Sequence, residues 1–270
     1  MSLSSVAMQS MQVALREGFP RVNGNYLSLP PTGGETPTFI EHIKAGLDAL
    51  ESSKDAVLVF SGGRTKQHLT DLSEAQSYYN LAKENNFFSK NALTGRIIIT
   101  ETHATDSYQN VLFSILRFRL YTGAYPSRMT IITHEFKRER FLKIHLPAIG
   151  WVPRTQEEPS DGLDDRARLI GINPPPEITS PESLVEGELK RGIGLWAKDR
   201  YGVGGDLGEK RRKRGWEGPG VFVGKGLEPV VERLVLWDGG EGGEGGNELF
   251  PMMEGLPWYF GKGDHERGEC

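Results

Sequence analysis

Short apolar runs alternate with longer amphipathic stretches between residues 36 and about 200. The runs begin at residues 56, 96, 129 and 167, so they recur every 33 to 40 positions. Each run is continuously apolar, which is the pattern of strands buried on both faces of a sheet. The spacing matches a strand plus a helical crossover to the next parallel strand. The pattern predicts an α/β domain with a mostly parallel sheet and strands at 56–60, 96–100, 129–133 and 167–172.

The amphipathic stretches between these runs have the length of helices. Residues 38–50 place apolar side chains at spacings of three and four, as on one face of a helix. Ser73 and Asp106 each precede such a stretch and are predicted N-caps, because their side chains can accept a hydrogen bond from an orphan backbone N–H. Further helices are predicted at about 136–149 and 181–197.

The two ends of the chain lack this regular pattern. Of the 34 glycines, 22 follow residue 185. A glycine has no side chain to bury, so burial in such a segment does not offset the conformational entropy that the chain loses on folding. Residues 1–35 contain no apolar run comparable to the four strands. The sequence therefore predicts an irregular segment over 1–35, an α/β domain over 36–215 and a flexible Gly-rich tail over 216–270.

Composition narrows the class of protein. Lys and Arg number 32 against 36 Asp and Glu, a net charge of -4, which argues against a general binder of nucleic acid or anionic membranes. The one cysteine, Cys270, forms no internal disulfide and favours a reducing compartment. No apolar run reaches the ~20 residues of a transmembrane helix, and no secretory signal is recognisable. We therefore expect a cytoplasmic protein without a transmembrane segment, and the sequence does not identify its protein partners.

Candidate site residues follow the predicted strands, because ligands of open parallel sheets bind beyond the carboxyl ends of the strands. Ser61, Gly62 and Gly63 follow the first strand, Glu101 the second and His134 the third. The glycine pair has two interpretations. It serves only a tight turn, or it also lets a ligand approach the backbone amides.

Basic residues give two further signals. Lys137 and Arg140 start a predicted helix, where the helix dipole favours acids; a bound anion would explain them, and a solvated helix face is the alternative. The run Lys210–Arg214 is either a solvated charge run, which we favour, or a patch for nuclear import or an acidic partner. The macrodipole alone accounts for Glu74 in the first turn of its helix.

Several established motifs are missing or out of context. The P-loop pattern and the G-x-S-x-G nucleophile elbow are absent. Residues 192–197 match G-x-G-x-x-A but follow a helix, so they do not predict a dinucleotide site. The six histidines show no H-E-x-x-H pairing, and no metal site is predicted.

Several ordered motifs together resemble the YdcF/SanA/ElyC family, catalogued as domain of unknown function 218. They are Val-Phe-Ser-Gly-Gly-Arg-Thr at 59–65, Ser-Glu-Ala at 73–75, Glu101 with Thr-Asp-Ser-Tyr-Gln-Asn at 105–110, and Thr-His-Glu-Phe-Lys-Arg-Glu-Arg-Phe at 133–141. Phe-Lys-Arg-x-Arg-Phe and the later Tyr-Gly-Val-Gly at 201–204 resemble the eukaryotic and fungal branch. The resemblance covers about residues 36–214.

The resemblance implies a Rossmann-like three-layer α/β/α sandwich, and S-adenosylmethionine as one ligand to consider. Family domains usually begin with an apolar strand and a Gly/His-containing loop, for which residues 1–35 offer no comparable run. Carried to matching positions, the family's polar set is Ser61, Gly62, Gly63, Glu74, Glu101, Asn110, His134 and Arg140.

These observations predict a protein, and possible enzyme, that binds a small anionic or nucleotide-like ligand at the carboxyl ends of the strands. Glu101 is the expected general base or ribose-hydroxyl acceptor, and His134 the expected proton donor or acceptor. The expected ligand-binding residues are Ser61, Gly62, Gly63, Glu74, Asn110, Lys137 and Arg140. The alternatives are a non-catalytic scaffold that uses the basic run and the tail as contact surfaces, or an inactive truncated paralogue.

Overall fold

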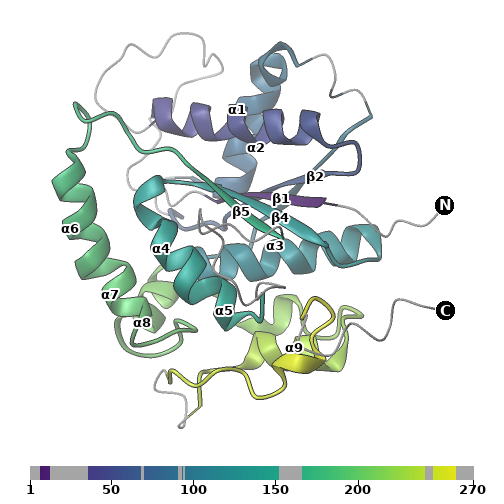
Figure 1. Cartoon of the computed structure of the whole chain (residues 1–270), viewed down its shortest axis with the longest axis vertical. Coiled ribbons are helices and arrows are strands. Elements are labelled where there is room, and N and C mark those ends of the chain that lie inside the picture. The colour runs from purple at the N-terminus through teal and green to yellow at the C-terminus, as the bar shows by residue number, and fades with distance from the viewer. Residues whose placement is uncertain are drawn as a thin grey trace.

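A five-stranded parallel sheet forms the centre of the protein (Figure 1). The computed structural model describes residues 7–12, 36–67, 70–90, 93, 95–151, 166–240 and 246–259, with only the backbone given for 7–12. The strand order is β3-β2-β1-β4-β5, and every neighbouring pair is parallel. The strands are β1 Ala7–Gln12, β2 Val57–Ser61, β3 Ile97–Glu101, β4 Arg128–Thr133 and β5 Ala167–Gly171. The α/β class and all four predicted strands are confirmed.

Helices separate and follow the strands. Ser73 and Asp106 are N-caps as predicted: Ser73 Oγ accepts from the Gln76 N–H at 3.1 Å, and Asp106 Oδ1 accepts from the Gln109 N–H at 2.9 Å. The α-helices are α1 Thr36–Ser52, α2 Glu74–Glu84, α3 Ser107–Thr122, α4 Arg138–Arg140, α5 Leu146–Ala148, α6 Pro181–Arg191, α7 Ile193–Trp196, α8 Gly205–Lys213 and α9 Pro229–Leu236.

Two predicted helices are broken into shorter ones. The expected helix at 136–149 comprises a 3₁₀ turn, α4, a π-helical turn over Phe141–His145, and α5. The expected helix at 181–197 breaks at Gly192, whose φ of -109° and ψ of -107° are not helical. A Cβ on Gly192 would lie 2.2 Å from Oε2 of Glu188, so a larger residue here would displace that carboxylate.

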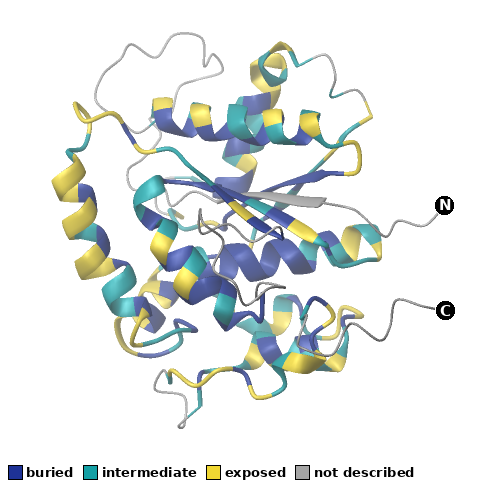
Figure 2. Ribbon diagram, viewed as in Figure 1, coloured by how far each residue is buried: buried dark blue, intermediate teal, exposed yellow. Residues whose placement is uncertain are grey.

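Helices cover both faces of the sheet. Successive residues of a strand point to opposite faces, so one strand contributes side chains to a core on each side. Leu58 and Phe60 belong to a core cluster that is completed by α1 and α2. Val57 and Val59 belong to a larger cluster that contains most of the buried side of α3. Figure 2 shows this burial on both sides of the strands.

The N-terminal segment contributes a strand that the sequence did not predict. Strand β1 pairs with β2 on one side and with β4 on the other, so it is central to the sheet. Its sequence, Ala-Met-Gln-Ser-Met-Gln, alternates weakly and has no β-branched residue, which is why the expectation of an irregular segment was wrong at residues 7–12. Residues 1–6 and 13–35 lie outside the described part of the chain.

Much of the expected flexible tail is folded onto the larger core cluster. Helix α9 contributes Val231 and Leu234, and Phe222, Phe250 and Trp258 are also buried there. The glycines lie between these apolar residues. The high glycine content of the segment therefore did not show that its large apolar side chains stabilise the fold by burial. The prediction was therefore wrong for 216–240 and 246–259; residues 241–245 and 260–270 lie outside the described ones.

Two hydrogen bonds fix the end of this C-terminal segment. Arg166 Nη2 donates to the Trp258 carbonyl at 2.8 Å, and Trp258 Nε1 donates to the Ile149 carbonyl at 2.7 Å. The Arg166 guanidinium also lies over the Trp151 ring, 4.6 Å from its centroid. The segment thus belongs to the domain. In the described part of the chain, no helix combines the length and apolarity needed to cross a membrane.

Candidate functional site

A polar cavity of about 50 Å³ lies where the connection after β3 enters α3, between the starts of α2 and α4 and helix α8. We call it the α3–α8 pocket. It is at the carboxyl ends of the strands, the edge at which ligands of parallel sheets bind. Its charged lining residues are Glu74, Asp106, Lys137, Arg140, Lys210, Arg211 and Arg214, and Ser107 and Asn110 add uncharged polar groups.

The pocket has an excess of positive charge. Arg211 forms an ion pair with Asp106, and Arg140 forms one with Glu188 at 3.0 Å. With Glu188 included and all groups ionised, five cations face three carboxylates. The described lining thus carries more positive than negative charge, which favours an anion in the pocket.

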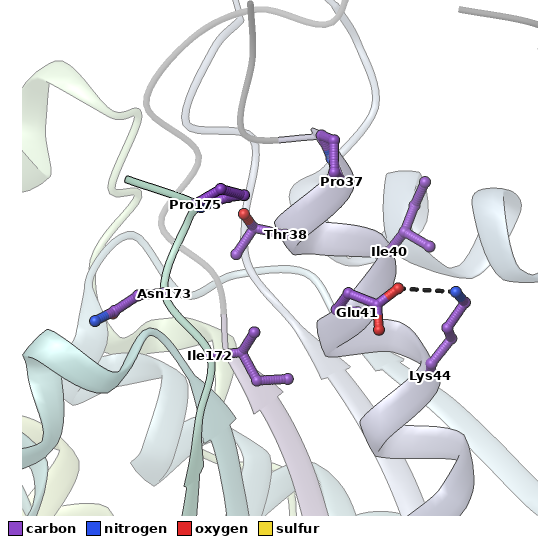
Figure 3. Close-up of a pocket in the computed structure, with 8 residues that line it drawn as sticks. All are labelled: Pro37, Thr38, Ile40, Glu41, Lys44, Ile172, Asn173 and Pro175. Atoms are coloured by element: carbon purple, nitrogen blue, oxygen red, sulfur yellow. Dashed lines mark hydrogen bonds and ion pairs between the residues drawn. The ribbon is translucent and has the colours of Figure 1, made fainter. Parts of the chain in front are cut away.

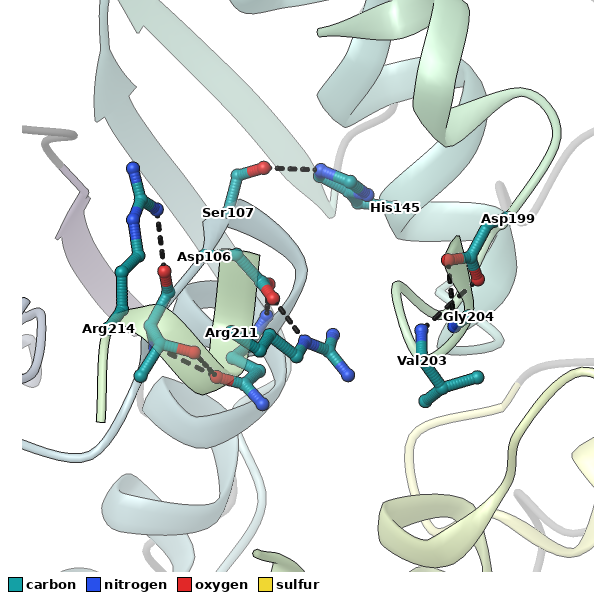
Figure 4. Close-up of polar contacts among 10 residues, drawn as sticks. Asp106, Ser107, His145, Asp199, Val203, Gly204, Arg211 and Arg214 are labelled. Carbon is teal, nitrogen blue, oxygen red and sulfur yellow. Dashed lines mark hydrogen bonds and ion pairs between the residues drawn. The ribbon is translucent and has the colours of Figure 1, made fainter. Parts of the chain in front are cut away.

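Helix α8 directs the basic run into the pocket. Arg211 is buried against Asp106, and Arg214 Nη1 donates to the Thr105 carbonyl at 2.7 Å (Figure 4). Lys210 also lines the pocket although it is exposed, whereas Arg212 and Lys213 are exposed and do not line it. Residues three and four apart share a helix face, so one helix separates the run into a pocket side and a solvent side. The favoured interpretation of a solvated charge run is therefore wrong for Arg211 and Arg214.

Two arginines of the pocket keep buried N–H groups without an acceptor. Among the described residues, Arg140 Nε and Arg211 Nη2 have no hydrogen-bond partner. Burial lowers the pKa of Arg140, and the Glu188 carboxylate opposes that effect. A buried unsatisfied donor costs about 1–3 kcal/mol, so a ligand acceptor would stabilise these groups.

Ser107 and His145 form a pair at the pocket that the sequence did not reveal. Ser107 Oγ lies 2.8 Å from His145 Nε2 (Figure 4). His145 is fully buried, and burial, with the charges of Arg140 and Arg211, lowers its pKa, so the imidazole is neutral. The two residues are 38 positions apart. The only sequence signal was the position of Ser107 directly after a predicted N-cap.

Glu74 lines the pocket and is a titratable group near neutral pH. Its Oε1 accepts a hydrogen bond from Thr65 Oγ1. Burial raises the pKa of Glu74 to about 7, while the Thr65 hydroxyl and the charges of Arg214 and Lys66 act in the opposite direction. The charge of the Glu74 side chain in the pocket therefore changes with pH near neutrality. The sequence analysis explained this residue only by its favourable interaction with the helix dipole.

Glu101 does not line the pocket. Its carboxylate accepts from Ser61 Oγ at 2.6 Å, from the His103 N–H at 2.6 Å and from the Ala104 N–H at 3.1 Å. Ser61 Oγ also lies 2.9 Å from Asn110 Oδ1. Burial raises the pKa of Glu101 to about 7. These contacts give Glu101 and Ser61 an internal structural role, in place of the expected catalytic and ligand-binding roles.

The Gly62 and Gly63 amides are used within the protein. Gly62 N donates to the Glu101 carbonyl at 3.0 Å, and Gly63 N donates to the Ala104 carbonyl at 2.6 Å. Gly62 has a φ of +148°, and a Cβ on Gly63 would lie 2.8 Å from the Ala104 oxygen. Both positions therefore need glycine for conformation and close packing. The expectation that these amides face a ligand was wrong.

His134 lies in an aromatic cluster and does not line the pocket. Its ring contacts His42 edge-on with centroids 4.9 Å apart, and the Phe39 and Phe136 rings lie at 6.1 and 5.2 Å. Burial, with the charge of Lys137, lowers the pKa of His134 well below its ordinary value. A neutral, buried imidazole does not suit the expected role of proton carrier near neutral pH.

A larger cavity of about 350 Å³ lies beside the first turns of α1 (Figure 3). Its charged pair, Glu41 and Lys44, bond to each other at 2.8 Å. Its Asn173 Oδ1 already accepts from the Phe136 N–H at 3.0 Å. The larger cavity thus has balanced charge and few free polar groups, so the α3–α8 pocket is the candidate site. No group of three or more metal-ligating side chains occurs among the described residues.

Of the nine residues expected from the sequence, Glu74, Asn110, Lys137 and Arg140 line this pocket. Comparison with known proteins adds one relative. The chain is 28% identical over 233 residues to Uncharacterized protein YOR238W of Saccharomyces cerevisiae, covering 70% of this chain and 73% of that protein. No protein-family model matches the chain, and no solved structure matches it significantly. Function therefore has to be inferred from the site.

Proposed function

We propose that this protein binds a small anionic ligand, of phosphate-ester or nucleotide-like type, in the α3–α8 pocket. The observation that carries the proposal is the convergence of five cationic side chains from two distant parts of the chain: Lys137, Arg140, Lys210, Arg211 and Arg214. Glu74, Asp106 and Glu188 offset part of this positive charge, and an anion in the pocket would offset more of it.

The start of α3 adds to the attraction. The helix has 16 residues, and its dipole places partial positive charge at Ser107, beside the cations. Asp106 uses the Gln109 N–H, so the cap satisfies part of this terminus and leaves the side chain of Ser107 on the pocket wall. Charge and helix orientation thus favour the same kind of ligand.

We further propose that the domain is a Rossmann-like α/β/α sandwich of the YdcF type. The strand order β3-β2-β1-β4-β5 supports this, since doubly wound domains use it and bind ligands where the order reverses. The helices on both faces and the central β1 also support it. S-adenosylmethionine is a ligand to test on the strength of the family resemblance alone.

The proposal is tested by ligand-induced thermal shift and calorimetric titration of the full chain. The probes are inorganic phosphate, pyrophosphate, ADP and S-adenosylmethionine. We expect at least one to stabilise the protein and Lys210→Gln to weaken its binding by at least about fivefold. The matched control is Lys213→Gln, because Lys213 is an exposed lysine of the same helix that does not line the pocket and pairs with Glu209.

Two results would contradict the proposal. One is that no probe stabilises the wild-type protein. The other is that Lys213→Gln weakens binding as much as Lys210→Gln does, since this would indicate general charge attraction in place of a defined pocket. Titration at two salt concentrations separates long-range attraction, which salt screens, from contacts within the pocket.

A further inference from the structure

We infer that the Ser107 hydroxyl, positioned by His145, donates a hydrogen bond to a phosphoryl group bound in the α3–α8 pocket. This inference rests on the proposed anion binding and adds the chemical class of the bound group and the residue that recognises it. Ser107 lines the pocket as the first residue of α3. Its Oγ lies 2.8 Å from His145 Nε2.

His145 is held in one orientation behind Ser107. Its side chain is fully buried, and its ring packs edge-on against Trp196 at 4.5 Å, Phe141 at 5.2 Å and Tyr108 at 6.1 Å between centroids. These contacts leave the imidazole little freedom to rotate. The bond from Nε2 therefore fixes the Ser107 hydroxyl, and His145 acts as a positioning residue.

The tautomer of His145 decides which way the Ser107 proton points. Among the described residues, His145 Nδ1 has no hydrogen-bond partner. A proton on Nδ1 would be a buried donor without an acceptor, and unpaired buried N–H groups are rarer than unpaired acceptors. Hydrogen bonding thus assigns the proton to Nε2, which donates to Ser107 Oγ. The O–H of Ser107 is then left for an acceptor in the pocket.

The other donors of the pocket match the oxygens of a phosphoryl group. Arg140 and Arg211 line the pocket, and each keeps one buried nitrogen donor without a hydrogen-bond partner among the described residues. An ionised phosphoryl group offers several terminal oxygens and no donor, so it can accept from the hydroxyl and from a guanidinium together. The cavity of about 50 Å³ has room for one such group, and the rest of a larger ligand would extend outside it.

The experiment measures the affinity of the full chain for inorganic phosphate by calorimetry. We expect Ser107→Ala to raise the Kd for phosphate about tenfold, the usual effect of losing one hydrogen bond to a charged group. Ser114→Ala is the matched control: Ser114 is also on α3, is fully buried, does not line the pocket, and its Oγ has no hydrogen-bond partner among the described residues. We expect the control to bind phosphate as the wild type does.

Variants of His145 test its positioning role. We expect His145→Leu to weaken phosphate binding as Ser107→Ala does. We expect His145→Gln to restore most of it, because the glutamine amide can donate to Ser107 Oγ from a similar place. A purely structural role would show no such rescue. Urea unfolding of each variant confirms that the protein tested is folded.

Three results would overturn the inference. Equal phosphate affinity of folded Ser107→Ala and wild type would remove the role of Ser107 while leaving the proposed anion binding intact. A phosphorylated Ser107 after incubation with p-nitrophenyl phosphate, seen by mass spectrometry, would make Ser107 a nucleophile and not a donor. If the wild type binds neither phosphate nor any other probe, the proposed function itself fails.

Discussion

Asp106 joins helix α3 to helix α8 by accepting at both of its oxygens. Oδ1 accepts from the Gln109 N–H at 2.9 Å and caps α3, and Oδ2 accepts from Nε of Arg211. Only 9% of the Asp106 side chain and 7% of the Arg211 side chain is exposed. Because water hardly reaches either group, each charge is stabilised mainly by the other. The ion pair holds α8 beside the pocket.

Replacing this carboxylate with an amide isolates the contribution of the charge. Asn is as good an N-cap as Asp, so Asp106→Asn retains the cap but leaves Arg211 buried without its counter-ion. We expect the free energy of unfolding, measured with urea, to fall by about 3 kcal/mol. Arg211→Met should cost less, because Asp106 keeps the Gln109 N–H and the helix dipole. Equal losses in the two variants would contradict this account.

The C-terminal segment should contribute directly to stability. Trp258 is fully buried and donates to the Ile149 carbonyl. We expect Trp258→Ala to lower the free energy of unfolding by about 3–5 kcal/mol, as large-to-small changes in a core do. The control is Leu249→Ala, since Leu249 is 51% exposed and should cost less than about 0.5 kcal/mol. If Trp258→Ala is as mild as the control, the segment is not part of the core.

Local sequence predicted those elements whose local preference agrees with their place in the fold. The β-branched and aromatic runs of β2, β3 and β4 are recognisable without any partner. Strand β1 has no such preference, and pairing with β2 and β4 on its two sides makes it a strand. The tail was misjudged because average composition does not reveal where buried residues such as Trp258 are placed.

The site was predicted in part for a similar reason. The rule that ligands bind beyond strand ends identified the correct edge of the sheet, and Lys137 and Arg140 line the pocket there. The rule does not tell which polar groups already have hydrogen-bond partners within the protein, so it predicts Glu101 as a base although three internal donors bond to its carboxylate. The contribution of α8 was missed because Arg211 meets Asp106 across 105 residues.

The buried His134 should make the protein sensitive to acid. Burial lowers the pKa of His134, whereas the unfolded chain has the ordinary value of about 6.5. Above pH 6.5 both states are neutral at this residue. Below it the unfolded state binds a proton that the folded state does not, so stability is lost as pH falls, by about 1.4 kcal/mol per pH unit.

This effect is measured as a difference between variants. Between pH 6 and pH 5, His134→Leu should gain about 1.2 kcal/mol in the free energy of unfolding relative to the wild type. Phe136→Leu, which alters a neighbouring ring without removing a titratable group, should show no such change with pH. A flat difference for His134→Leu would mean that His134 is protonated in the folded protein or remains neutral in both states.

Glu74 should make anion binding depend on pH. Burial raises the pKa of Glu74 to about 7, so its carboxylate loses a proton between pH 6 and pH 8 and then repels an anion in the same pocket. Binding should therefore be tighter at the lower pH. Repulsion across several ångströms of partly buried space amounts to about 1–2 kcal/mol, so the Kd should rise by about five- to thirtyfold.

Sulfate is the suitable probe, because its charge is constant over this range while that of phosphate is not. In calorimetric titrations, Glu74→Gln should bind sulfate with nearly the same affinity at pH 6 and pH 8. Glu209→Gln should keep the wild-type dependence, since Glu209 is an exposed carboxylate of α8 that pairs with Lys213. A pH dependence that persists in Glu74→Gln would assign the titrating group to another residue and remove Glu74 from the site.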